Sequence, residues 1–192
     1  MAKAPLFILS GPSGSGKSTV IARLLADQDL PLRLAVSATT RPPRKNERAG
    51  EHYHFWTREQ FDRERAADGF LEWAEVFGMG YFYGTLKTEV EPYRDRGVGV
   101  LLEIDVKGWE QVRRRCPEAV SFFLRTSSLE TYEKRLRERG TESEASIRRR
   151  LGEARAELAR APEYDYQIVN DNLDDAVAEL RTIIRSKFSE NS

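Results

Sequence analysis

A glycine-rich segment near the N-terminus, residues 11–19, holds the residues whose types and spacing are most specific for chemistry. It matches the phosphate-binding loop pattern G-x-x-x-x-G-K-[ST] in full, between an apolar run at 6–9 and a helical run at 20–25. Glycines let backbone N–H groups converge on an anion, Lys17 can reach the outer phosphates, and the Ser18 hydroxyl can bind Mg2+. The alternative is a glycine turn with an incidental lysine. We predict a nucleoside triphosphate site formed by Gly11, Pro12, Ser13, Gly14, Ser15, Gly16, Lys17, Ser18 and Thr19.

Two further pairs of charged residues are candidates for binding phosphate or metal. Arg41 and Arg44 flank two prolines that keep the backbone extended, so both guanidinium groups can converge on one phosphate; two solvated surface arginines are the alternative. Glu103 and Asp105 come at the end of a strand predicted at 98–104. Residues two apart share a strand face, so both carboxylates can point toward the glycine loop and organise Mg2+. Alternatively, such an acid caps the helix that follows.

A basic helical region provides the third candidate group. Residues 129–160 have a helical pattern interrupted at Gly140, and basic residues outnumber acidic ones in most of this stretch. Arg135, Arg139 and Arg150 bracket the interruption. They predict either a lid that closes over a triphosphate or a solvated helical face.

The elements that must position these residues are those of an α/β fold. Helical patterns separate most of the short apolar runs, which lie at 6–10, 34–37, 98–104, 120–124 and 166–170. This predicts a parallel sheet between helices, with a final helix at 173–188. Residues 39–93 are richer in aromatic and turn residues, which predicts a small, partly antiparallel insertion with one short helix. Capping-box patterns predict helix starts at Thr57, Ser127 and Thr141.

Length and composition narrow the function classes. At 192 residues the chain fits one domain with a sizeable core, and its formal net charge of zero argues against nucleic acid as the main partner. We see neither a signal peptide nor a membrane span, and the single cysteine, Cys116, suggests a reducing compartment. We therefore expect a cytoplasmic protein without nucleic-acid or membrane partners, either a monomer or a homodimer.

Several motifs in a fixed order give the chain a family resemblance. They lie at 11–18, 37–44, 70–75, 83–85, 102–108, 139–142 and 168–171. With them the chain resembles the guanylate kinases, which transfer the γ-phosphoryl group of ATP to GMP, over nearly its whole length. The resemblance implies a P-loop NTPase-type core (1–36, 94–126 and 162–192), an inserted mixed-β GMP-binding region (about 37–93), a helical lid (about 127–161), and a requirement for Mg2+ with ATP.

The resemblance also implies roles for individual residues, each by its position in these motifs. Guanine would be read by Ser37, Glu72 and Thr85, with Asp105 also on the GMP side. The GMP phosphate would be held by Arg41, Arg44, Tyr53 and Tyr83. The transferred phosphoryl group would be surrounded by Lys17, Arg44, Arg139 and Arg150, and the ATP side would include Arg135, Asn170 and Asp171.

The chemistry of guanine supports the role that the resemblance gives Glu72. Guanine presents two adjacent donors, N1–H and the 2-amino group, and a carboxylate accepts both, whereas adenine would set a ring lone pair against the negative charge. On the strand pattern alone, Glu72 would be a solvent-facing acid on a half-buried strand.

One departure and two rival functions remain open. The spacing between Glu75 and Tyr83 is longer than the family's usual spacing, so Tyr81 competes with Tyr83 for the phosphate-facing role. One rival is an inactive guanylate kinase-like module that binds proteins; intact Lys17 and Ser18 argue against it. The other is a P-loop kinase for another phosphorylated small molecule.

Overall fold

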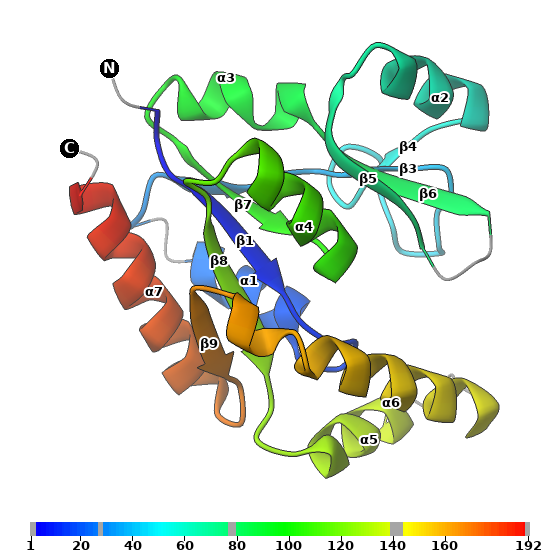
Figure 1. Cartoon of the computed structure of the whole chain (residues 1–192), viewed down its shortest axis with the longest axis vertical. Helices are drawn as coiled ribbons and strands as arrows, with labels where there is room; N and C mark the ends of the chain where they lie inside the picture. Colours follow the sequence, from blue (N-terminus) through cyan, green and yellow to red (C-terminus); the bar gives the residue numbers. More distant parts are fainter. Residues whose placement is uncertain (1–2, 27–28, 77–79, 139–143, 191–192) are drawn as a thin grey trace.

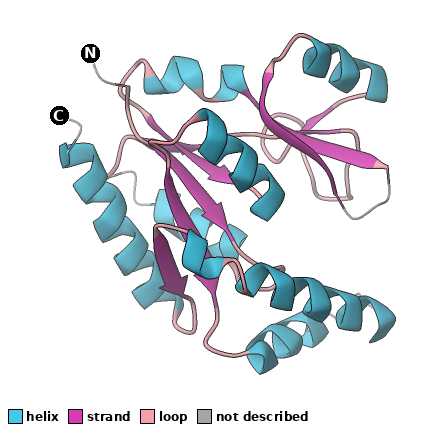
Figure 2. Ribbon diagram, in the orientation of Figure 1, coloured by secondary structure: helices cyan, strands magenta, loops and turns pink. Residues whose placement is uncertain are grey.

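The main sheet of the protein has five parallel strands in the order β2-β7-β1-β8-β9. The structure is a computed structural model that describes residues 3–26, 29–76, 80–138 and 144–190. The five strands are Leu6–Ser10 (β1), Leu32–Leu34 (β2), Gly99–Glu103 (β7), Val120–Arg125 (β8) and Tyr166–Val169 (β9). Helices lie on both sides of this sheet (Figures 1 and 2), which confirms the predicted α/β class.

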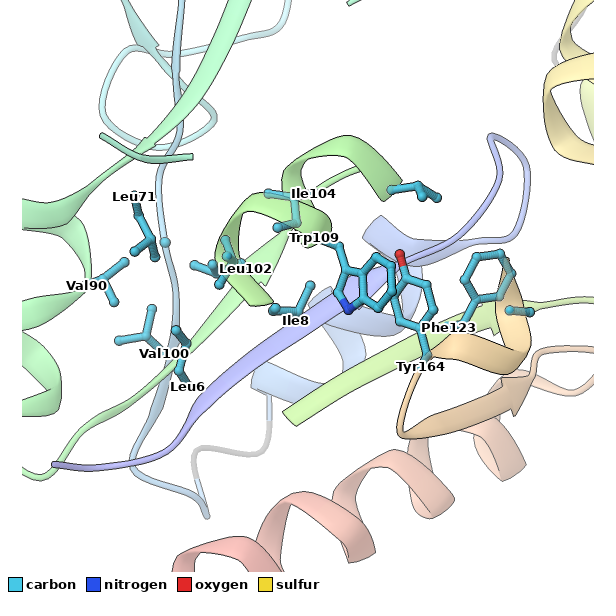
Figure 3. Close-up of a cluster of buried hydrophobic side chains, with 14 residues drawn as sticks. Leu6, Ile8, Leu71, Val90, Val100, Leu102, Ile104, Trp109, Phe123 and Tyr164 are labelled. Atoms are coloured by element: carbon cyan, nitrogen blue, oxygen red, sulfur yellow. The ribbon is translucent and has the colours of Figure 1, made fainter. Parts of the chain in front are cut away.

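The alternating side chains of the central strand β1 explain why both faces are covered. Leu6 and Ile8 belong to one buried cluster and Phe7 and Leu9 to another, so this strand reads as a continuous apolar run. The first cluster includes side chains of one long helix that covers that face (Figure 3), and the second includes side chains of two. These helices are α4 (Val106–Arg115) on the first face, and α1 (Lys17–Ala26) and α7 (Leu173–Glu190) on the second. None of the helices within the described ranges is both long and apolar enough to cross a membrane.

The chain between β2 and β7 forms a second sheet, which is mixed and has the order β4-β3-β6-β5. Its elements are Ala38–Thr39 (β3), His54–Phe55 (β4), Arg58–Ala66 (α2), Phe70–Val76 (β5) and Tyr81–Leu86 (β6), followed by a 3-10 turn (Lys87–Glu89) and α3 (Glu91–Arg94). Thr57 and Gln60 form the predicted capping box of α2. Phe61 stacks on Phe70 at 4.4 Å between ring centroids, so this insertion has an aromatic core of its own.

Two packed helices, α5 (Leu129–Glu138) and α6 (Glu144–Leu158), form an arm beside the main sheet, followed by a 3-10 turn (Ala161–Glu163) (Figure 1). The predicted cap at Ser127 is wrong by one residue. Ser128 Oγ accepts the Thr131 N–H at 3.4 Å, whereas the Ser127 N–H donates to the Asp171 carboxylate at 3.0 Å. Either of the two successive serines could cap the helix. The hydrogen bond from Ser127 to Asp171 holds Ser127 elsewhere and leaves Ser128 as the cap. The predicted start at Thr141 lies outside the described residues.

The strand predicted at 34–37 is instead the crossing between the two sheets. β2 ends at Leu34, and the Ala35 N–H still donates to Leu101 O of the main sheet at 2.9 Å. Ser37 O already accepts the His54 N–H of the insertion, also at 2.9 Å. An apolar run continues through this crossing because each sheet buries part of it, so hydrophobicity alone does not mark where one sheet ends.

Candidate active site

The phosphate-binding loop joins β1 to α1, and two of its glycines pack closely against distant parts of the chain. Gly11 has a φ of +148°, and a Cβ there would lie 2.1 Å from the Leu124 carbonyl oxygen of β8. Gly16 has a φ of +94°, and a Cβ there would lie 2.4 Å from Asn170 Nδ2. Both backbone conformation and space therefore require glycine at these two positions.

Arg135 and Asn170 bind the carbonyl groups of this loop. Arg135 Nη1 donates to Ser15 O at 3.3 Å and, more weakly, to Gly14 O at 3.5 Å, while its Nη2 donates to Asn170 O at 2.9 Å. Asn170 Nδ2 donates to Ser15 O at 2.7 Å. Carbonyls held in this way leave the loop N–H groups for an anion. This bracing of the loop was missed in the sequence, because it joins residues more than a hundred positions apart.

Lys17 and Ser18 are the first two residues of α1, directly after the loop. Lys17 Nζ donates to Gly11 O at 2.5 Å and to Pro12 O at 3.3 Å, and Thr19 is exposed. Ser18 Oγ donates to Glu103 Oε1 at 3.2 Å. β1 and β7 are neighbouring parallel strands, so the carboxyl end of β7 brings Glu103 beside the loop.

Asp105 takes a different position from Glu103, which corrects the expectation that both share one strand face. β7 ends at Glu103, and Asp105 is the N-cap of α4, where its Oδ1 accepts the Gly108 N–H at 2.8 Å. The capping alternative therefore holds for Asp105. The predicted strand, 98–104, was one residue too long at each end; at the carboxyl end Ile104 is buried without belonging to the ladder.

Helix α6 brings two charged side chains to the loop. Arg150 Nη1 donates to Ser13 Oγ at 3.0 Å. Burial raises the pKa of the Glu157 carboxyl, Lys17 lowers it, and Asp105 raises it, so Glu157 lies within electrostatic reach of both the loop and α4. Glu157 was missed in the sequence, where it is one of many charges on a helix. Arg139, expected beside Arg150, lies outside the described residues.

Glu72 is the buried acid of the insertion. The residue is 5% exposed, and Thr85 Oγ1 on β6 donates to its Oε1 at 2.7 Å. Burial raises the pKa of this carboxyl to about 7, although the Thr85 hydrogen bond lowers it; the Asp105 charge adds to the rise. Glu72 is therefore not the solvent-facing acid that the strand pattern alone suggests. Because Ala38 pairs with Gly84, the preceding Ser37 lies level with Thr85.

Arg41 is the centre of a second charged group in the insertion. Its guanidinium binds the Glu47 carboxylate through two hydrogen bonds of 2.9 Å each, and its Nε donates to Tyr83 Oη at 2.9 Å. The Glu47 hydrogen bond raises the pKa of Arg41, and Arg41 lowers the pKa of Glu47. Glu47 also accepts the N–H of the exposed Arg44 at 2.8 Å. Glu47, which was missed in the sequence, thus binds both the Arg41 side chain and the Arg44 backbone.

Tyr53 and Tyr83 complete this group. Their rings meet edge to face at 5.8 Å. Burial raises the pKa of the Tyr53 hydroxyl, and the Glu103 charge raises it next, so Tyr53 lies within electrostatic reach of the Glu103 carboxylate of the core. Tyr83 is the tyrosine that accepts the Arg41 hydrogen bond, which favours it over Tyr81 for the phosphate-facing position. Residues 77–79, within the unusual spacing, lie outside the described residues.

The fold and the loop together define the class of the protein. A complete G-x-x-x-x-G-K-[ST] loop between β1 and α1 of a parallel sheet is the defining element of P-loop nucleotide-binding enzymes. Known proteins that resemble the chain then identify the family.

The family model for guanylate kinase matches residues 3–187. The guanylate kinase of Synechococcus sp. (strain JA-3-3Ab) is 49% identical over 179 residues, covering 93% of this chain and 81% of the relative. That of Escherichia coli (strain K12) is 45% identical over 188 residues, covering 97% and 90%. A crystal structure of guanylate kinase from Anaplasma phagocytophilum matches with a TM-score of 0.78 at 32% identity, covering 97% and 87%. The chain belongs to the guanylate kinase family, as the ordered motifs predicted.

Proposed function

We propose that this enzyme transfers the γ-phosphoryl group of ATP to GMP, giving ADP and GDP, as part of purine nucleotide metabolism in the cytoplasm. Family membership supports the reaction. The observation that carries the choice of acceptor is the Glu72 carboxylate, which is 5% exposed and receives a hydroxyl hydrogen bond from Thr85. Each oxygen of an ionised carboxylate has two acceptor sites, so this group can receive further donors from a ligand.

Glu72, Thr85, Ser37 and Asp105 form the proposed guanine site. Glu72 accepts N1–H and the 2-amino group of guanine, and these two hydrogen bonds compensate the burial of its charge. Adenine offers a lone pair at N1, which leaves the charge unpaired at a cost of about 2 to 5 kcal/mol. This difference is large enough to exclude AMP at equal concentration.

The phosphate of GMP binds to Arg41, Arg44, Tyr53 and Tyr83. Arg41 then exchanges part of its bonding with Glu47 for the phosphate, because the planar guanidinium fork can donate to two oxygens of a phosphate as it does to the two oxygens of a carboxylate. The insertion, residues 37–93, is the GMP-binding region under this proposal.

Phosphoryl transfer needs positioning and charge neutralisation more than proton transfer. The attacking phosphate oxygen of GMP is anionic at neutral pH, and donor and acceptor repel each other. Lys17, Arg44 and Arg150 neutralise this charge, together with Arg139 of the segment outside the described residues. Transition-state arginines of this kind supply about 10^3 to 10^5 in rate, or about 4 to 7 kcal/mol. The contact of Arg150 with Ser13 supports its place near the loop.

The residues beside the loop fit Mg2+. Ser18 Oγ and Glu103 Oε1 lie 3.2 Å apart, and both are hard oxygen ligands of the kind that Mg2+ accepts alongside water and substrate phosphates. Ser18 would bind the ion directly, with Glu103 and Asp105 acting through water. When bound, Mg2+ neutralises developing charge on the phosphates.

Arg135, Asn170 and Asp171 form the proposed ATP side, and residues 127–161 the arm and lid. Arg135 and Asn170 support the loop from behind by holding its carbonyls. Closure of the arm excludes water that would otherwise hydrolyse ATP.

A coupled ADP-release assay tests the proposal. The enzyme is given ATP, Mg2+ and, separately, GMP, AMP, UMP, CMP or a ribose phosphate. We expect turnover with GMP only, and its collapse in Glu72→Gln. Glu75→Gln, an exposed acid of the same strand, is the matched control and should behave like the unmodified enzyme. Equal turnover of GMP and AMP would refute the assignment.

A further inference from the structure

Helix α4 of the core lies along β5, the edge strand of the insertion that carries Glu72. Gln111 Oε1 accepts the Trp73 N–H at 3.3 Å, and Gln111 Nε2 donates to Trp73 O at 2.8 Å. Arg115 Nη1 donates to Phe70 O at 2.6 Å. Gly108, Gln111 and Arg115 are spaced by three and four residues, so they share one face of α4. That face therefore holds β5 on both sides of Glu72.

The strand itself is irregular at the same point. The register of β5 with β6 shifts between Phe70 and Glu72, which indicates a bulge at Leu71. Phe70 belongs to the apolar cluster of the insertion and Leu71 to that of the main sheet, and Glu72 lies against the first turn of α4. Such bulges re-aim side chains.

Gly108 is the point at which α4 meets the Glu72 carboxyl group. A Cβ on Gly108 would lie 2.9 Å from Glu72 Oε2, 3.3 Å from Glu72 Cδ and 3.2 Å from Ile104 Cβ. Gly108 is in α4, where the backbone conformation suits any L residue and alanine is the better helix former. The backbone conformation therefore does not favour glycine here, and what a larger residue would disturb is the position of the Glu72 carboxyl group.

We propose that Gly108 is a positioning residue for guanine selection, because its missing side chain leaves the space in which the Glu72 carboxylate sits. This inference rests on the proposed function and deepens it. The carboxylate is the movable end of a flexible side chain, so an alanine at position 108 displaces it while the fold persists. A displaced carboxylate no longer meets both guanine donors, and a shift of about 1 Å is enough to weaken such a site up to about a hundredfold.

The test compares Gly108→Ala with the unmodified enzyme. We expect KM for GMP to rise by about tenfold or more, with kcat at saturating GMP, KM for ATP and Tm nearly unchanged. Gly152→Ala on α6 is the control, because a Cβ there meets no atom within 4 Å. A general loss of stability would instead lower Tm and alter both substrates. Gly108→Ala with the GMP affinity of the unmodified enzyme would overturn the inference.

A double-mutant cycle separates positioning of Glu72 from other effects. In the Glu72→Gln background the carboxylate is already gone, so Gly108→Ala should change KM for GMP by less than about twofold. A full tenfold effect in that background would show that Gly108 acts independently of Glu72 and would overturn the inference.

Gln111→Ala is the second variant and decides the question if Gly108→Ala does not fold. It removes the two hydrogen bonds to Trp73, and we expect KM for GMP to rise about fivefold with KM for ATP unchanged. An unchanged KM for GMP in this variant would count against positioning by α4. Failure of the proposed function is distinguishable from all of these outcomes, because the unmodified enzyme would then not prefer GMP.

Discussion

Replacing Glu72 by glutamine should stabilise the protein and impair its catalysis, because the acid is buried and we propose that it binds the guanine base. Burial raises the pKa of this carboxyl from 4.5 to about 7. The folded state therefore holds the proton more tightly than the unfolded state does. The resulting stability is fully present below about pH 4.5 and is lost as the pH rises to about 7.

The magnitude follows from the shift in pKa. A difference of about 2.5 units corresponds to about 3 kcal/mol of unfolding free energy. Glutamine does not ionise, so Glu72→Gln avoids this loss. For a chain of this length 1 kcal/mol changes Tm by about 2 to 4 °C. Between pH 4.5 and pH 8, the Tm of the variant should therefore gain about 6 to 12 °C relative to that of the unmodified enzyme.

Thermal unfolding of both proteins at pH 4.5, 6 and 8 measures this difference, and titrating groups that do not interact with Glu72 cancel in it. Glu75→Gln, at an exposed position, should show no comparable gain. In the same preparations, kcat/KM for GMP should fall at least about a hundredfold in Glu72→Gln. A Tm difference that is the same at pH 4.5 and pH 8 would refute the argument that burial holds this carboxyl near pH 7.

Three further predictions concern the phosphate groups. Arg150→Ala should leave Tm within a few degrees and lower kcat at least about a hundredfold in a steady-state assay; near-normal turnover would remove Arg150 from the catalytic residues. Glu103→Gln should raise the Mg2+ concentration for half-maximal rate by about tenfold in a titration at fixed ATP, since a neutral amide is the weaker partner for hydrated Mg2+; an unchanged titration contradicts its metal role. Tyr83→Phe removes the oxygen that binds Arg41 and should raise KM for GMP by about fivefold, whereas Tyr81→Phe should not; the reverse result would transfer the role to Tyr81.

Features that depend on neighbouring residues in the chain were predictable from the sequence. The glycine loop could be predicted because a positive φ favours glycine at its own position whatever the rest of the fold, as the φ of +94° at Gly16 illustrates. The capping box at Thr57 is equally local. The ordered motifs carried the family, and the fold class came with them. Where local signals were ambiguous, as between Ser127 and Ser128, prediction failed by one residue.

The sequence by itself thus determined the phosphate loop, the α/β class and the family. Only the tertiary structure decided that Glu72 is buried, that Asp105 caps a helix while Glu103 meets Ser18, and that Glu47 binds Arg41. These outcomes depend on which distant element packs against each side chain, and a carboxylate looks the same in sequence whether it meets solvent, a cation or a helix start. The burial of an acid and its pairing with other groups depend on the residues that folding brings next to it. These neighbours set the pKa and the role of the acid, and the sequence alone does not show them.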